Sequence, residues 1–153
     1  HPFAAATRGL EGKELAEFGL MKAAGARAVA TGRRWIADSG VMHRVLSYAA
    51  AFGMTVVAHA EDGDLAAGAV ATAGETASRL GLPAAPAVAE AMAIARDIAL
   101  VGEVGTPVHF RQVTTEAGFD LIRAAKARGL PVTCGSTPAH LFLADNAVAD
   151  FRT

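Results

Sequence analysis

The chain has 153 residues, 52% of them hydrophobic, with 14 Lys and Arg against 15 Asp and Glu and a formal net charge of −1. This length is enough for one hydrophobic core, so the chain is expected to form one domain. The balanced charge excludes a strongly basic nucleic-acid-binding protein and gives no reason to expect binding to an anionic membrane.

Short runs rich in β-branched residues alternate along the chain with alanine-rich helical stretches, and glycines separate them. In the first half, the predicted elements are a helix at 13–24, a strand at 26–30, a helix at 41–52 and a strand at 54–59. Asp38 or Ser39 is a good N-cap for the second of these helices. From 60 to 85, glycines and charged residues break the periodicity, and we expect a loop with a helical insert.

The second half of the chain shows the same alternation of predicted helices and strands. The predicted elements are a helix at 87–104, a strand at 107–113, a helix that ends at Arg128 and a strand at 130–134. Thr114 or Thr115 caps the later helix. Strands that alternate with helices are typical of βαβ units and a parallel sheet, so the predicted fold class is α/β.

Four strands in this order fit either an open doubly wound sheet or part of a (β/α)8 barrel, because a complete barrel needs about 250 residues. The chain starts at His1 without an initiator Met and stops at Thr153 without a tail. We therefore expect residues 1–153 to be a single partial domain, truncated at both ends. Its edge strands would be unpaired, so the isolated chain should be inactive and should form homo-oligomers or belong to a longer polypeptide.

Polar residues follow the predicted strands, where parallel α/β folds collect their reactive groups. His59 is the best single candidate, since an imidazole can bind a metal through one nitrogen while a carboxylate orients the other N–H. Glu61 and Asp62 follow it directly. The alternatives are a hydrogen-bonded histidine that closes the sheet and a solvated turn for the two carboxylates.

Two further histidines pose separate questions. Residues three apart on a regular strand point to opposite faces, so His109 and Gln112 cannot both face one crevice. If Gln112 faces inward, His109 packs against a helix. Gln112 offers a neutral amide, which is a poor zinc ligand compared with imidazole or thiolate. His140, after the last predicted strand, is either a site residue or a loop-anchoring histidine.

The single cysteine, Cys134, excludes an intrachain disulfide framework and a cysteine-based zinc site. It suits a reducing compartment, and we expect a cytoplasmic protein. Because no stretch approaches 18 uncharged apolar residues, we expect no membrane span. A P-loop, a dinucleotide-binding fingerprint and a Gly-x-Ser-x-Gly elbow are absent from the sequence.

Several segments become informative when they are taken together. One of them is the strand end His59-Ala-Glu-Asp62. The others lie at 9–15, 38–42, 75–90, 95–97, 108–109, 122–134 and 137–143. Their order and spacing closely resemble those of the dihydroorotases and related cyclic amidohydrolases.

This resemblance implies the central portion of a (β/α)8 TIM-type amidohydrolase barrel. In that family, one or two zinc ions activate water to attack the carbonyl of a cyclic amide. Dihydroorotases interconvert carbamoyl-aspartate and dihydroorotate in pyrimidine biosynthesis, and members often associate with aspartate transcarbamoylase.

Most metal ligands that the resemblance implies are missing from the chain. His59 matches one ligand, but Gln112 stands where the family has the second histidine of His-x-x-His. Residues 30–32 offer neither a carboxylate nor a carboxylated lysine, and Pro138-Ala139-His140 replaces Pro-His-His. Because a catalytic zinc needs about three protein ligands, we expect zinc binding by this segment to be weak or absent.

Three functions follow. The first is a dihydroorotase-type hydrolase whose ancestral site used His59, or one that keeps a single metal on the family's His-x-His pair, which this chain does not cover, with His59 as helper. The second, which we favour, is a noncatalytic homologue that serves as structural partner of aspartate transcarbamoylase. The third is a hydrolase of another cyclic amide, such as a hydantoin or allantoin.

Overall fold

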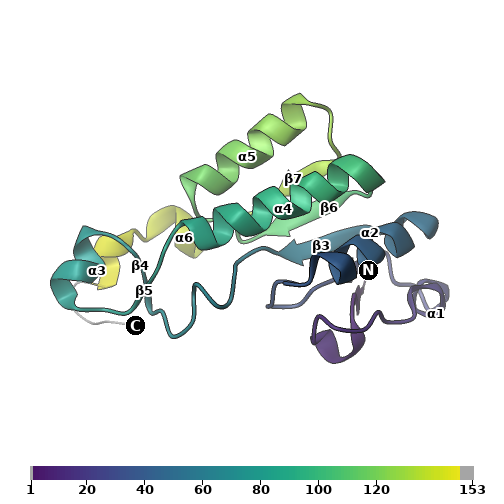
Figure 1. Ribbon diagram of the computed structural model, residues 1–153, viewed down its shortest axis with the longest axis horizontal. Coiled ribbons are helices and arrows are strands. Elements are labelled where there is room, and N and C mark those ends of the chain that lie inside the picture. Colours follow the sequence, from purple (N-terminus) through teal and green to yellow (C-terminus); the bar gives the residue numbers. More distant parts are fainter. Residues whose placement is uncertain (1, 149–153) are drawn as a thin grey trace.

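The computed structural model of the protein describes residues 2–148, and its centre is a parallel five-stranded sheet (Figure 1). The strands in spatial order are β1 (Phe3–Ala5), β2 (Ala28–Ala30), β3 (Thr55–His59), β6 (Val108–Arg111) and β7 (Val132–Cys134). Each strand is added to the same edge in chain order, whereas the order of a doubly wound sheet reverses at a switch point. The sheet is therefore part of a (β/α)8 barrel, which confirms the predicted fold class.

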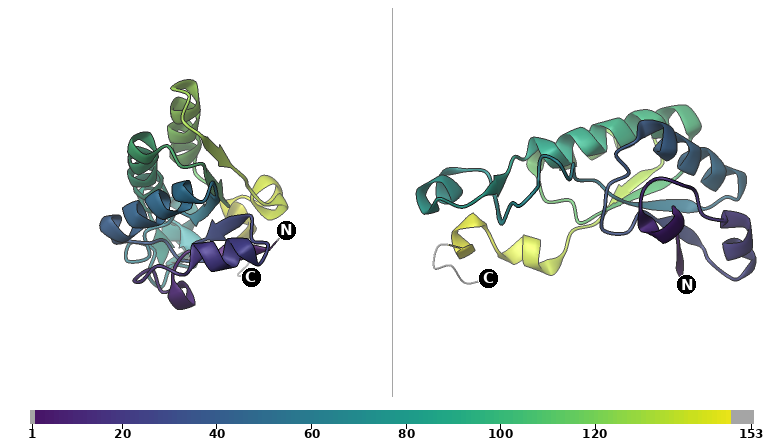
Figure 2. Two further views of the ribbon diagram at one scale, coloured as in Figure 1. Left: turned by 90° about the vertical axis from the view of Figure 1, so that its right-hand side faces the viewer. Right: turned by 60° about the horizontal axis from the view of Figure 1, so that its bottom comes forward.

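Helices cover one face of this sheet. They are α1 (Phe18–Ala23), α2 (Ser39–Ala51), α4 (Val88–Val104) and α5 (Glu116–Ala127). Figure 2 shows α2, α4 and α5 side by side, and the rings of Phe18 and Tyr48 stack at 4.7 Å to join α1 to α2. Alternate strand residues pack under these helices and form the core with them, among them Val29, Val56, Ala58, Val108, Phe110 and Val132.

The other face of the sheet carries the polar residues. Side chains alternate along a strand, so the neighbours of the core residues point to the opposite side. The register pairs Val57 with His109 and His59 with Arg111. Paired residues on parallel strands share a face, which places His59, His109 and Arg111 on the inner face of the partial barrel.

Both predicted helix caps are present. The Asp38 carboxylate accepts a hydrogen bond from the Val41 N–H at 2.9 Å at the start of α2. The Thr115 hydroxyl accepts one from the Gly118 N–H at 3.0 Å at the start of α5. These caps satisfy N–H groups that have no partner within their own helix.

Two features of the N-terminal part differ from prediction. Strand β1 was missed, because Phe3 is followed by alanines, whose preference for strands is low. The helix predicted at 13–24 begins only at Phe18. Leu15 instead forms an antiparallel bridge with Thr7, so a long-range pairing overrides the helical spacing.

An arginine fastens α4 to the loop before α2. The Arg96 guanidinium lies 4.2 Å from the centroid of the Trp35 ring and donates to the Ile36 carbonyl at 2.6 Å. It also donates to the carboxylate of Asp97 at 2.7 Å. Asp97 is fully buried, and this burial raises the pKa of its carboxyl to about 6 although Arg96 opposes the shift.

The segment 60–85 forms a small unit beyond the sheet. It contains β4 (Ala71–Thr72), α3 (Glu75–Leu80) and β5 (Ala84–Ala85), and the two short strands pair in parallel. This agrees with the predicted loop and helical insert. The unit lies at the end of the sheet toward which the arrow of β3 points, and the C-terminal η2 (Asp145–Val148) contacts it (Figure 1). The short elements α6 (Pro138–Phe142) and η1 (Arg8–Leu10) complete the described chain.

None of the helices within residues 2–148 has the length and hydropathy needed to cross a membrane.

Candidate functional site

His59 ends β3 at the carboxyl edge of the sheet, where sequence analysis placed the site. Its backbone N–H donates to the Thr31 hydroxyl at 3.0 Å, which links β3 to the end of β2. The Nε2 atom lies 3.5 Å from the Glu61 carboxylate. The Nδ1 atom is buried and has no hydrogen-bond partner in the described part of the chain. Glu61 thus orients the imidazole through Nε2, while Nδ1 has no hydrogen-bond partner among the described residues.

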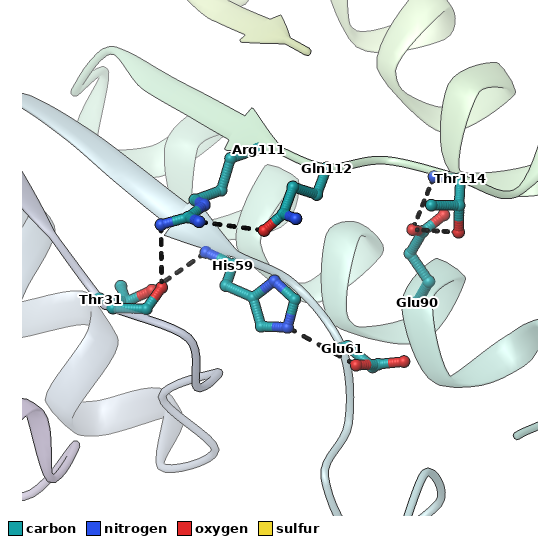
Figure 3. Close-up of polar contacts among 8 residues, drawn as sticks. Thr31, His59, Glu61, Glu90, Arg111, Gln112 and Thr114 are labelled. Atoms are coloured by element: carbon teal, nitrogen blue, oxygen red, sulfur yellow. Dashed lines mark hydrogen bonds and ion pairs between the residues drawn. The ribbon is translucent and has the colours of Figure 1, made fainter. Parts of the chain in front are cut away.

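Gln112 follows β6 and lies on the same side of the sheet as His59 (Figure 3). Its backbone has φ of 58°, a left-handed conformation that is uncommon for a residue other than glycine. The strand alternation therefore ends at Arg111. Arg111 Nη2 donates to Gln112 Oε1 at 3.0 Å, and Nη1 lies 3.5 Å from the Gly32 carbonyl oxygen.

The expectation for His109 was wrong. His109 lies on the inner face, where its Nδ1 is 2.9 Å from the Thr133 hydroxyl of the neighbouring strand, and it does not pack against a helix. Opposite faces for His109 and Gln112 would require a regular strand through position 112. The left-handed turn at Gln112 breaks that regularity and brings both side chains to one side.

A cavity of about 440 Å³ opens at this edge of the sheet. It is lined by His59, Glu61, Gln112 and His140, together with residues of the 60–85 segment. His140 lies on α6, and its Nδ1 is 2.7 Å from the Thr137 hydroxyl. The fold thus brings together four of the predicted site residues, whose chemical roles stay predictions.

Asp62 does not line this cavity. Its carboxylate accepts hydrogen bonds from the N–H groups of Asp64 and Leu65, at 3.0 and 3.1 Å. Its own N–H donates to the Ala89 carbonyl at 3.0 Å. These contacts are those of a side chain that shapes a turn, which was the alternative role considered for it.

Glu90, a buried carboxylate, also lines the cavity and is not among the residues predicted for the site. Its oxygens accept from the N–H groups of Thr114 and Thr115, at 2.9 and 2.8 Å, and from both hydroxyls, at 3.1 and 2.5 Å. This set of contacts, the Glu90 cluster, joins α4 to the loop that carries Gln112. A signal existed, because Glu90 shares a helical face with the apolar residues Ala93 and Ile94.

Gly118 fits tightly under the Glu90 cluster. A Cβ atom there would lie 2.7 Å from Glu90 Oε2 and 3.0 Å from both Ile94 Cδ1 and Thr115 Oγ1. Alanine normally stabilises a helix relative to glycine, but overpacking here should make Gly118→Ala destabilising by about 2 kcal/mol. Urea unfolding of the full-length protein measures this change.

Gly102→Ala in α4 is the matched control, since the nearest atom to its Cβ would be Leu130 Cδ1 at 4.0 Å. This variant should gain about 0.5–1 kcal/mol. Equal stabilisation by both alanines would show that the site around Gly118 has room, contrary to the prediction.

The side chains of residues 2–148 do not by themselves fit a metal ion. Within residues 2–148, no group of three or more His, Cys, Asp or Glu side chains is placed to hold one. His59 offers one suitable nitrogen, but the amide oxygen of Gln112 already accepts from a guanidinium. Catalytic zinc takes about three protein ligands, so the described residues fall short of this number.

A partial (β/α)8 barrel with an imidazole, a carboxylate and an amide around a cavity at its carboxyl edge carries these groups where barrel enzymes place their active sites. Residues 1–117 match the family described as "Dihydro-orotase-like". A dihydroorotase of Pelotomaculum thermopropionicum is 45% identical over 153 residues, which is 100% of this chain and 36% of the relative. A dihydroorotase-like protein of Pseudomonas aeruginosa is 41% identical with the same coverage.

Among solved structures, an L-hydantoinase (dihydropyrimidinase) from Arthrobacter aurescens is similar, with a TM-score of 0.74 and 24% identity. The match covers 95% of this chain and 34% of the hydantoinase, and at this identity it supports the fold. The chain thus spans about a third of the length of the proteins it matches. It belongs to the dihydroorotase-like family of cyclic amidohydrolases, as its motifs predicted.

Proposed function

We propose that the protein is a dihydroorotase homologue with a degenerate metal site, which does not hydrolyse cyclic amides and instead serves as structural partner of an aspartate transcarbamoylase. The observation that carries this proposal is that the side-chain oxygen of Gln112 is hydrogen-bonded to Arg111. Resemblance to the family assigns a metal-binding histidine to this position. Here an amide oxygen occupies it and accepts a hydrogen bond from Arg111 at 3.0 Å.

Electrostatics support the same conclusion. Arg111 stands beside His59 in the strand register, and neighbouring strands are about 4.8 Å apart. The guanidinium carries a permanent positive charge. Two positive charges repel each other. The guanidinium of Arg111 thus disfavours the binding of a metal ion beside His59.

The fold is preserved although the donor set is reduced. Strand residues such as Val56 and Phe110 are fully buried beneath the helices, and the Glu90 cluster holds the loop after β6 in place. Such a barrel can present a stable surface without catalysing a reaction. The partner is proposed from the family resemblance, because dihydroorotases often associate with aspartate transcarbamoylase.

The test uses the full-length protein, purified with the aspartate transcarbamoylase of the same organism. We expect zinc far below one equivalent per chain, no interconversion of carbamoyl-aspartate and dihydroorotate, and co-elution of the two proteins. The P. thermopropionicum dihydroorotase, prepared identically, serves as positive control. Stoichiometric zinc together with turnover would refute the proposal.

One observation favours a second candidate, a cyclic-amide hydrolase that keeps a single metal. His59 Nδ1 is buried without a partner in the described residues, while Glu61 lies 3.5 Å from Nε2, as a histidine prepared for a metal would be. The full-length protein would then bind one zinc and hydrolyse dihydroorotate or a hydantoin-type ring. His59→Ala should abolish zinc binding and turnover together, and a panel of cyclic amides would identify the substrate.

A further inference from the structure

We propose that the guanidinium of Arg111 takes the structural place of a metal ion at the ends of β2, β3 and β6, and that Arg111, more than the absence of a histidine at position 112, keeps divalent metals out. This inference rests on the degenerate site proposed above. It adds the residue responsible and a physical cause.

The position of the guanidinium follows from the strand register. Arg111 pairs with His59, so the two side chains leave the sheet on the same face and side by side. The Arg111 side chain then crosses the end of β3 toward β2, where Nη1 lies 3.5 Å from the Gly32 carbonyl oxygen. Figure 3 shows the guanidinium between Gln112 on one side and the end of β2 on the other.

The contacts of the guanidinium are those that a cation would make. It draws together the amide oxygen of Gln112 and the carbonyl oxygen of Gly32, which come from segments 80 residues apart. Both oxygens direct lone pairs at a positive charge. A guanidinium stays protonated in proteins, so it supplies that charge at every working pH.

A metal ion at this edge would therefore face two obstacles. Gln112 Oε1 is already engaged by Arg111, and any ion bound at His59 would lie beside a permanent positive charge. Replacing Gln112 by histidine removes the weak ligand but leaves the charge. Replacing Arg111 as well removes both obstacles.

The experiment compares the zinc affinity of four versions of the full-length protein: wild type, Arg111→Met, Gln112→His and the double variant. Affinity is measured by competition with a chromophoric chelator, and Co²⁺ absorption reports ligation independently of activity. We expect weak binding by the wild type and both single variants. The double variant should bind zinc about 100-fold more tightly than Gln112→His, a change of the size seen when the surroundings of metal ligands are altered.

A charge-matched control separates charge from shape. Arg111→Lys combined with Gln112→His keeps the positive charge without the planar fork, and it should bind zinc as weakly as Gln112→His alone. Circular dichroism of each variant confirms that it is folded. Arg111→Met should also lower the thermal midpoint, whereas a chelator should leave the midpoint of the wild type unchanged.

The outcomes distinguish this inference from the proposed function. Tight stoichiometric zinc in the wild type would overturn the degenerate site itself. A Gln112→His variant that binds as tightly as the double variant would show that the missing histidine is the whole cause, and the role of Arg111 would be rejected. A double variant no better than wild type would reject it as well.

Discussion

Replacement of Glu90 by alanine should lower the free energy of unfolding by about 3 kcal/mol, because two partly buried backbone N–H groups would lose their charged acceptor. The N–H groups are those of Thr114 and Thr115, whose hydroxyls also donate to Glu90. The hydroxyls can rotate to other partners, but the backbone groups are fixed. Urea denaturation of the full-length protein measures the loss.

Glu103→Ala provides the matched control, since it removes a glutamate from the same helix. Glu103 is 73% exposed at its side chain, and its contact with His43 is 3.6 Å long. An exposed pair of this kind contributes about 0–1 kcal/mol. If Glu90→Ala changed stability no more than Glu103→Ala, the Glu90 cluster would have no special role in holding the loop after β6.

The second large effect depends on pH and concerns Asp97. Burial raises the pKa of its carboxyl from 3.8 to about 6 in the folded protein. Between these values the folded state binds more protons than the unfolded state, so the contribution of Asp97 to stability falls as pH rises from about 4 to about 6. One pKa unit corresponds to about 1.4 kcal/mol, so this decline amounts to about 3 kcal/mol.

Asp97→Asn removes this titration. The stability of the variant relative to wild type should therefore increase by about 3 kcal/mol between about pH 4 and pH 7, measured by urea unfolding at each pH. Other carboxyl groups cancel in this difference. Asp120→Asn is the control, because it removes a carboxylate from an exposed ion pair with Arg123. The stability of this variant relative to wild type should change by less than about 1 kcal/mol over the same pH range. A difference that is flat for Asp97→Asn would contradict the prediction.

Most helices and strands could be predicted from the sequence, because interactions between residues close in the chain determine where they begin and end. Asp38 and Thr115 cap the helices that their positions indicated, and His59 ends the strand that was predicted to end there. Prediction from the sequence failed where distant residues decide. Leu15 pairs with Thr7 in place of helix formation, and the alanines of β1 are held in a strand by their pairing with β2.

The candidate site was predictable in its location and less so in its detail. His59, Glu61, Gln112 and His140 do line one cavity. The error at His109 arose from the backbone of Gln112, since a left-handed φ of 58° at a residue other than glycine has no local sequence signal.

Arg111 could have been found by the parity rule itself. It lies two residues after His109 and therefore shares its face of β6. The contact between Arg111 and Gly32 could not be predicted from the sequence, because it depends on the spatial order of β2, β3 and β6.

The unit formed by β4, α3 and β5 has a consequence for how the cavity could diversify. Val70, Ala71, Thr72 and Ala85 form part of the cavity wall, yet they belong to a segment outside the main sheet. Substitutions or insertions in this segment can remodel the mouth of the cavity while the barrel strands keep their pairing. Part of the cavity wall therefore comes from a segment that can change without altering the pairing of the strand that carries His59.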